Sequence, residues 1–90
     1  MSARVGSEMA HVRMLAFAGA REILGAAEVD MPLSAPCSVA ELLEQVCHRW
    51  PALAPYRRSL RLAVNGAYAA AGDPVRGGDE VAIIPPVAGG

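Results

Sequence analysis

The C-terminal residues of the chain form a stretch suited to chemistry at a terminal carboxylate. Residues 86–90 include no charged side chain and none bulkier than valine. Glycine at the last two positions lets the backbone enter a channel too narrow for other residues. A frayed end is the simpler alternative, but it needs neither this glycine tip nor the stiff Pro85-Pro86 pair. We therefore predict that the tail carries the Gly90 carboxylate up to about 17 Å into a partner. The tail residues before it are Pro86, Val87, Ala88 and Gly89.

Side chains elsewhere in the sequence give no catalytic constellation. Cys37 and Cys47 are the only cysteines, too few for a disulfide framework, a four-thiolate cluster or a paired-CxxC zinc site. Only His48 adjoins a cysteine, so we predict no metal site. His11 and His48 have no nucleophile at a defined spacing and are expected at the surface. We expect no active site within the domain itself.

One amphipathic helix dominates the predicted structure. Ser38 and Glu41 form an S-x-x-E capping box, which is typical of a helix start. Apolar residues then recur at spacings of three and four. They are Val39, Leu42, Leu43, Val46, Cys47 and Trp50. Pro51 stops the helix, because proline disfavours helical backbone before it. We predict a helix over residues 38–50 with Cys47 on its apolar face.

The segment before this helix is predicted to form a pair of strands. Residues 11–18 are rich in apolar side chains and reach strand length. Residues 19–25 are bounded by glycines and have room for about two helical turns. Residues 28–33 alternate polar and apolar side chains, as a half-buried strand does. The two strands are natural partners in a hairpin-like pair.

The segment after the helix is predicted to add further strands. Beyond an irregular stretch at residues 51–59, residues 60–64 have strand character and run into Asn65-Gly66, a dipeptide suited to a tight hairpin turn. A return strand follows around Tyr68, and residues 80–85 form the last strand. A helix on one face of such a mixed sheet is an α+β roll.

Apolar residues on the strands occupy both faces of the predicted sheet. By alternation, one set faces the helix. It consists of Val12, Met14, Val81 and Ile83. A second set then faces outward. It consists of Leu15, Phe17, Ala82 and Ile84. One helix cannot cover both faces, and an exposed apolar sheet face favours a partner site.

Composition sets limits on the class of protein. Ninety residues, of which 53% are hydrophobic, suffice for one domain. A net charge of −1 with scattered basic residues argues against nucleic acid or an anionic membrane as partner. All eight basic residues are arginine, which excludes chains linked through an internal lysine. No signal peptide or membrane span is expected, so we predict a cytoplasmic protein.

Residues 1–11 are polar and contain glycine and serine, which predicts a disordered N-terminal extension. The later motifs are Leu15-Ala16-Phe17-Ala18 with Arg21-Glu22, Ser38-Val39-Ala40-Glu41, Val64-Asn65, and GDEVAIIPPVAGG over residues 78–90. They resemble the small subunit of molybdopterin synthase, a family of ubiquitin-like β-grasp sulfur carriers. The resemblance covers the chain from about Val12 to its end and implies a β-grasp domain at 12–85 and a flexible tail at 86–90. The alanine-rich residues 69–71 depart from the larger side chains usual in the family.

The resemblance also implies a mechanism. An E1-like adenylating enzyme would use ATP to activate Gly90, and a sulfur donor would convert it to a thiocarboxylate. The large subunit of molybdopterin synthase would then accept this sulfur for cyclic pyranopterin monophosphate, through contacts with Phe17, Tyr68 and Ile84. The small subunit itself would bind no cofactor.

Three other functions stay open at this point. A thiamine-pathway sulfur carrier shares the fold and the Gly-Gly tip, but as a family lacks the Pro-Pro-Val stem. A ubiquitin-like modifier would instead be attached to lysines of other proteins. A plain interaction module would leave the tail inert.

Overall fold

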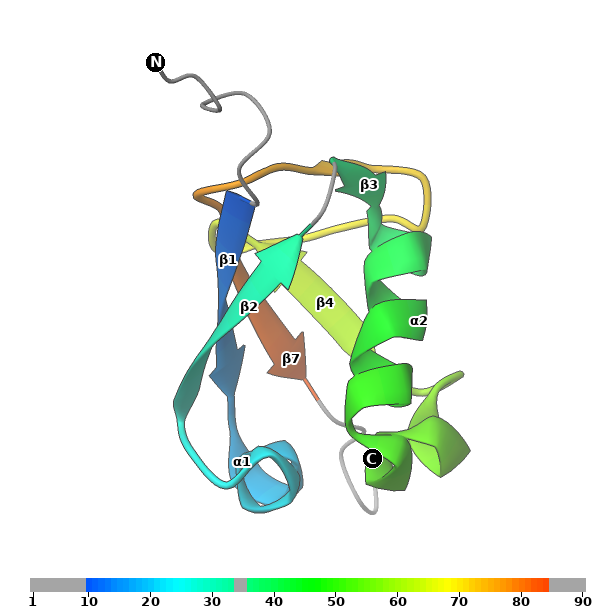
Figure 1. Ribbon diagram of the computed structural model, residues 1–90. Helices are drawn as coiled ribbons and strands as arrows, with labels where there is room; N and C mark the ends of the chain where they lie inside the picture. Colours follow the sequence, from blue (N-terminus) through cyan, green and yellow to red (C-terminus); the bar gives the residue numbers. More distant parts are fainter. Residues whose placement is uncertain (1–9, 34–35, 85–90) are drawn as a thin grey trace.

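The computed structural model describes residues 10–33 and 36–84 of the chain and arranges them as a sheet with one main helix (Figure 1). The strands are β1 (Ala10–Ala16), β2 (Glu28–Leu33), β3 (Cys37–Ser38), β4 (Arg61–Val64), β5 (Ala67–Tyr68), β6 (Pro74–Val75) and β7 (Glu80–Ile84). The helices are α1 (Ala18–Leu24), α2 (Val39–Arg49) and the 3-10 helix η2 (Pro51–Tyr56).

The five-stranded sheet has the order β2-β1-β7-β4-β5. Strands β1 and β7 run parallel, whereas the β1–β2, β4–β7 and β4–β5 pairs are antiparallel. Strands β3 and β6 form a separate two-stranded ribbon. Helix α2 crosses one face of the large sheet (Figure 1). The predicted mixed α+β roll is therefore confirmed.

The core lies between α2 and the inner face of the sheet. Leu42 and Val46 of α2 are fully buried. So are the four strand residues predicted to face the helix, Val12, Met14, Val81 and Ile83. Burying a side chain of this size contributes about 1.5–3 kcal/mol. Alternation along β1 and β7 thus assigned the two sheet faces correctly.

Helix α2 begins as the capping box predicts. The Ser38 N–H donates to Glu41 Oε1 at 2.9 Å, and the Glu41 N–H donates to Ser38 Oγ at 3.1 Å. The helix ends at Arg49, just before Trp50 and the proline that follows it. Because Leu42 lies at the centre of the buried stripe, its neighbour Leu43 lies on the flank and is only half-buried. Leu43 thus packs against the core, as its place on the apolar face predicts, but it is less buried than Leu42.

The structure also differs from the predictions at residues 51–56, at the short strands β3 and β6, and at both ends of β1. Residues 51–56 form the helix η2 instead of an irregular stretch, and its Leu53 side chain is buried in the core. Strands β3 and β6 contain two residues each, too few for a periodic pattern. Strand β1 begins at Ala10, inside the segment predicted as an N-terminal extension, and it ends at Ala16.

The predicted hairpin turn joins β4 to β5. Asn65 and Gly66 have φ angles of 51° and 88°, both in the left-handed region that this turn requires. At Gly77 the constraint is space, because a Cβ added there would lie 2.3 Å from the Cβ of Ala10. The loop before β7 therefore packs directly on the start of β1.

Across the described part of the chain, every helix is too short or too polar to cross a membrane.

Candidate functional site

The face of the large sheet opposite α2 presents a continuous row of apolar residues. Leu15 of β1 is in register with Ala82 of β7, Ala82 with Ala63 of β4, and Ala63 with Tyr68 of β5. Paired residues in adjacent strands point to the same face of a sheet. The row therefore crosses four strands, with two small alanines between a leucine and a tyrosine.

Two larger side chains extend this row towards the end of β7. Ile84 lies two residues beyond Ala82 and so shares its face. Phe17 follows β1 with extended backbone, at φ −127° and ψ 155°, so the alternation of β1 continues through it. Phe17 and Tyr68 are 53% and 69% exposed, unusually high for large apolar side chains.

Together these residues form what we call the sheet patch. Its members are Leu15, Phe17, Ala63, Tyr68, Ala82 and Ile84. The three predicted partner-binding residues, Phe17, Tyr68 and Ile84, thus share one face. Ala63 lies between β5 and β7, and sequence reasoning missed it because its place depends on the long-range register of β4 with β7. An apolar surface of this kind is suited to contact another protein.

Ion pairs border the sheet patch on the side of β2. Arg13 Nε lies 3.5 Å from Glu28 Oε2, and Arg13 Nη2 lies 4.0 Å from Glu80 Oε2. His11 Nδ1 lies 2.9 Å from Asp30 Oδ2. These groups are exposed, so each pair contributes little to stability. They form a solvated border that limits the apolar surface.

The end of β7, where the described residues before the C-terminal tail stop, lies at the edge of the sheet patch. Ile84 is in register with Arg61 of β4, and its neighbour Ile83 is in register with Ala16 of β1. The predicted tail, 86–90 with its reactive Gly90, lies outside the described residues. The geometry therefore gives the position from which the tail departs.

A hydrogen-bond network holds the other end of β7 to the β4–β5 turn. Asn65 Nδ2 donates to Asp79 Oδ1 at 3.0 Å, while the Glu80 N–H donates to Asn65 Oδ1 at 2.9 Å. The Arg76 N–H donates to Asp79 Oδ2 at 2.9 Å. Donation from the Arg76 backbone, followed by that from Asn65, lowers the pKa of Asp79. Sequence reasoning did not find this network, because its two ends are 14 residues apart.

The two cysteines lie away from the sheet patch. Cys47 is buried on the apolar face of α2, as predicted, and burial raises the pKa of its thiol. Cys37 is half-buried in β3, and its pKa is raised by burial and, to a smaller extent, by the charge of Glu41. A raised pKa keeps a thiol protonated and poorly nucleophilic near neutral pH.

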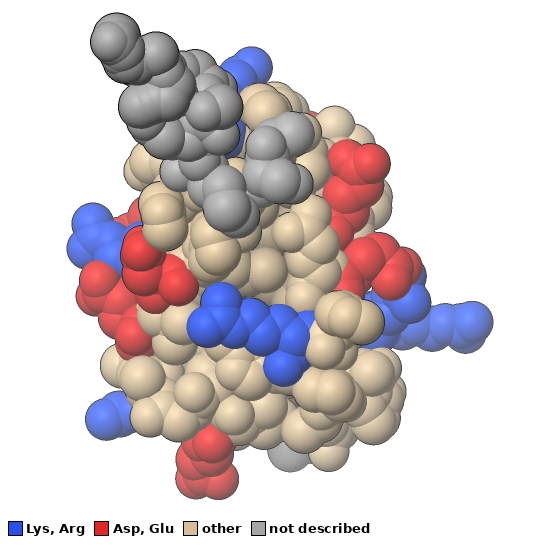
Figure 2. All heavy atoms as spheres, viewed as in Figure 1, with Lys and Arg blue, Asp and Glu red and all other residues tan. Residues whose placement is uncertain are grey.

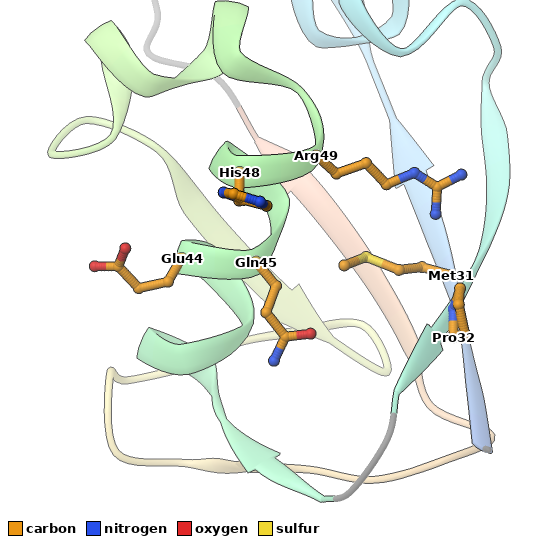
Figure 3. Close-up of a pocket in the computed structure, with 6 residues that line it drawn as sticks. All are labelled: Met31, Pro32, Glu44, Gln45, His48 and Arg49. Atoms are coloured by element: carbon orange, nitrogen blue, oxygen red, sulfur yellow. The ribbon is translucent and has the colours of Figure 1, made fainter. Parts of the chain in front are cut away.

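A hollow between α2 and β2 gathers the other polar side chains of interest (Figure 3). Its volume is about 490 Å³, and it is lined by Met31, Pro32, Glu44, Gln45, His48 and Arg49. Arg49 extends towards Met31, whereas Glu44 points away from β2 (Figure 3). His48 is exposed there, as predicted. The lining includes neither a thiol nor a hydroxyl that His48 could activate as a nucleophile.

Comparisons with known proteins agree with this architecture. The model of the ThiS family matches residues 14–90. The molybdopterin synthase sulfur carrier subunit of Aedes aegypti is 37% identical over an alignment of 90 positions, which covers 92% of each chain.

Two solved structures show the same fold. The putative molybdopterin converting factor, subunit 1, from Pyrococcus furiosus has a TM-score of 0.76 at 27% identity, covering 87% of this chain and 99% of that one. The small archaeal modifier protein 1 of Haloferax volcanii has a TM-score of 0.72 at 28% identity, with the same coverage. The fold is the ubiquitin-like β-grasp. The chain therefore belongs to the ThiS family and, within it, to the molybdopterin synthase sulfur carrier subunits.

Proposed function

We propose that this sulfur carrier of molybdenum cofactor biosynthesis works through the carboxylate of Gly90. The observation that carries the proposal is the likeness to molybdopterin synthase sulfur carrier subunits over nearly the whole chain. The family match also runs to Gly90 itself. In the described residues, the raised pKa values of both thiols argue against a cysteine as the sulfur-bearing group.

Chemistry at a terminal carboxylate requires activation, because a carboxylate is a poor electrophile. An E1-like enzyme would join Gly90 to the AMP portion of ATP and release pyrophosphate. A sulfur donor would then displace AMP from this mixed anhydride and leave a thiocarboxylate. ATP would thus be bound by the activating partner and not by this chain. The sulfur of the thiocarboxylate is the nucleophile that the small subunit would bring to the pterin substrate.

The sheet patch would bind the large subunit of molybdopterin synthase. Phe17, Tyr68 and Ile84 supply its apolar contacts, and the small, half-buried side chain of Ala82 lies on the same face. Because Ile84 is the last described residue before the tail, docking of the patch would fix the point from which the tail extends into the same partner. From there, six residues reach at most about 20 Å.

A mass-spectrometric assay of thiocarboxylate formation tests the role of Gly90. The chain is incubated with ATP, a sulfur source and the activating enzyme of its own host, and the complete chain is weighed. The deletion of Gly90 leaves a carboxylate but shortens the tail by about 3.4 Å. A displacement of 1 Å can cost about 100-fold in rate, so we expect sulfur transfer to fall by at least that factor.

The matched control replaces both thiols, Cys37→Ser with Cys47→Ser. This variant should keep sulfur transfer wherever it folds, because the sulfur is carried on a carboxyl carbon. Activity that survives the loss of Gly90 but disappears in a folded cysteine-free chain would overturn the proposal.

A protein modifier is the second candidate, favoured by the likeness to small archaeal modifier protein 1. Both functions use an activated terminal carboxylate and differ in the acceptor. Chain isolated from its host would carry a thiocarboxylate as a sulfur carrier. A branched peptide that joins Gly90 to a lysine of another protein would indicate the modifier.

A further inference from the structure

A second surface feature adjoins the sheet patch at the β5 edge of the sheet. It is a hollow of about 350 Å³ between the first turns of α2, the segment after η2, and β4 with β5. We call it the arginine hollow. Its lining residues include Leu43, Arg57, Arg58, Leu60, Arg61 and Tyr68. Leu60 is buried and Leu43 half-buried, so they form an apolar floor in a hollow that three arginines also line.

The charges of the arginine hollow are only partly balanced. Arg57 forms an ion pair with Glu44 of α2. Among residues 10–33 and 36–84, no carboxylate lies within ion-pair distance of Arg58 or Arg61. Three arginines and one glutamate leave a local charge of +2. Figure 2 shows arginine side chains projecting at the right-hand edge of the molecule, on the side of α2.

The arginine hollow is continuous with the sheet patch through two residues. Tyr68 belongs to both, and Arg61 is in register with Ile84, from which the tail departs. Arg61 is exposed and lies on the strand next to β7. A protein that covers the sheet patch and receives the tail must therefore pass close to Arg61.

We propose that the arginine hollow binds an acidic segment of the large subunit of molybdopterin synthase, with carboxylates on Arg58 and Arg61. This inference rests on the proposed function. A guanidinium group accommodates a carboxylate through two parallel hydrogen bonds, and complementary charges fix the orientation of two proteins as they meet. The apolar floor of Leu43 and Leu60 favours a peptide, which can add an apolar side chain, over a small inorganic anion.

Charge reversal in the hollow tests the inference. The affinity and the association rate of the purified chain for the large subunit of its own host are measured at low and at high ionic strength. Arg61→Glu and Arg58→Glu should each weaken binding by about tenfold at low salt, mainly through slower association. The loss should shrink at high salt, because screening weakens interactions between exposed charges.

Arg49→Glu is the matched control. It makes the same change in net charge in the hollow between α2 and β2, and Arg49 belongs neither to the sheet patch nor to the lining of the arginine hollow. It should leave the affinity within about twofold of the wild type. Melting temperatures of all variants show that they are folded.

Two results would overturn the inference. One is that Arg58→Glu and Arg61→Glu bind the large subunit as Arg49→Glu does at both salt concentrations. The other is that inorganic phosphate binds at Arg58 and Arg61 while both reversals leave large-subunit affinity unchanged, which would indicate a small-anion site. In either case a wild-type chain that still binds the large subunit and forms a thiocarboxylate would leave the proposed function standing. A wild-type chain that forms no complex at all would overturn both.

Discussion

Truncation of Leu42 to alanine should be among the most damaging single changes in the helix. Leu42 has no exposed surface and lies at the centre of the α2 stripe that packs on the sheet. Removing a buried leucine side chain costs about 2–5 kcal/mol of unfolding free energy, the sum of lost transfer energy and a residual cavity. In a domain of this size each kcal/mol shifts the melting temperature by about 4–8 °C. We therefore expect a drop of at least about 8 °C.

The neighbouring substitution Leu43→Ala is the control that makes this experiment sharp. Leu43→Ala removes the same atoms, but Leu43 is only partly buried, so less than the roughly 1.5–3 kcal/mol for a fully buried leucine is at stake. Both variants are unfolded with urea and followed by circular dichroism. The orientation of α2 would be refuted if Leu42→Ala lost less than about 0.5 kcal/mol of unfolding free energy, or if Leu43→Ala lost more than Leu42→Ala.

Three further outcomes follow from the sheet patch and its supports. Ile84→Asp should weaken binding to the large subunit with little change in melting temperature, because an unpaired carboxylate is costly only when desolvated; unchanged affinity in a calorimetric titration would contradict it. Gly77→Ala should destabilise by about 1–3 kcal/mol through its contact with Ala10, and urea unfolding equal to wild type would argue against that contact. The lowered pKa of Asp79 means that its stabilising effect is present above the unfolded pKa of about 3.9 and is lost as pH falls through the folded value. Asp79→Asn should make the free energy of unfolding less dependent on pH in this acidic range. An unchanged pH dependence would show that other groups cause the loss of stability in acid.

Periodic patterns were sufficient to predict the main elements of the fold. The capping box at Ser38 and the spacing after it defined α2, and alternation separated the two faces of β1 and β7. Elements too short to show a period, such as β3 and β6, could not be found in this way. The partial burial of Leu43 also depends on how α2 is rotated about its own axis against the sheet. The spacing of apolar residues does not show which of two neighbouring residues lies at the centre of the buried stripe.

The sheet patch was predictable only in part. Phe17 and Ile84 follow from alternation, whereas Tyr68 was identified through resemblance to the family. Ala63 and Arg61 depend on the register of β4 against β7, which pairs residues about 20 positions apart in the chain. Neither composition nor local spacing carries that information.

The structure explains why two separate motifs of this family belong together. Asn65 follows β4 and Asp79 precedes β7, and their hydrogen bonds join the hairpin turn to the start of β7. Strand β7 is the central strand of the sheet, paired with β1 on one edge and β4 on the other. Its first residues are thus held by Asn65 and Asp79, and its last residue, Ile84, borders the sheet patch. Because sulfur transfer depends on placing a terminal group within a fraction of an ångström to about 1 Å, a tail that follows the central strand, which is paired on both edges, has a fixed origin. Loss of the Asn65–Asp79 contact should therefore affect transfer through the position of β7, at the end of the strand opposite to Ile84.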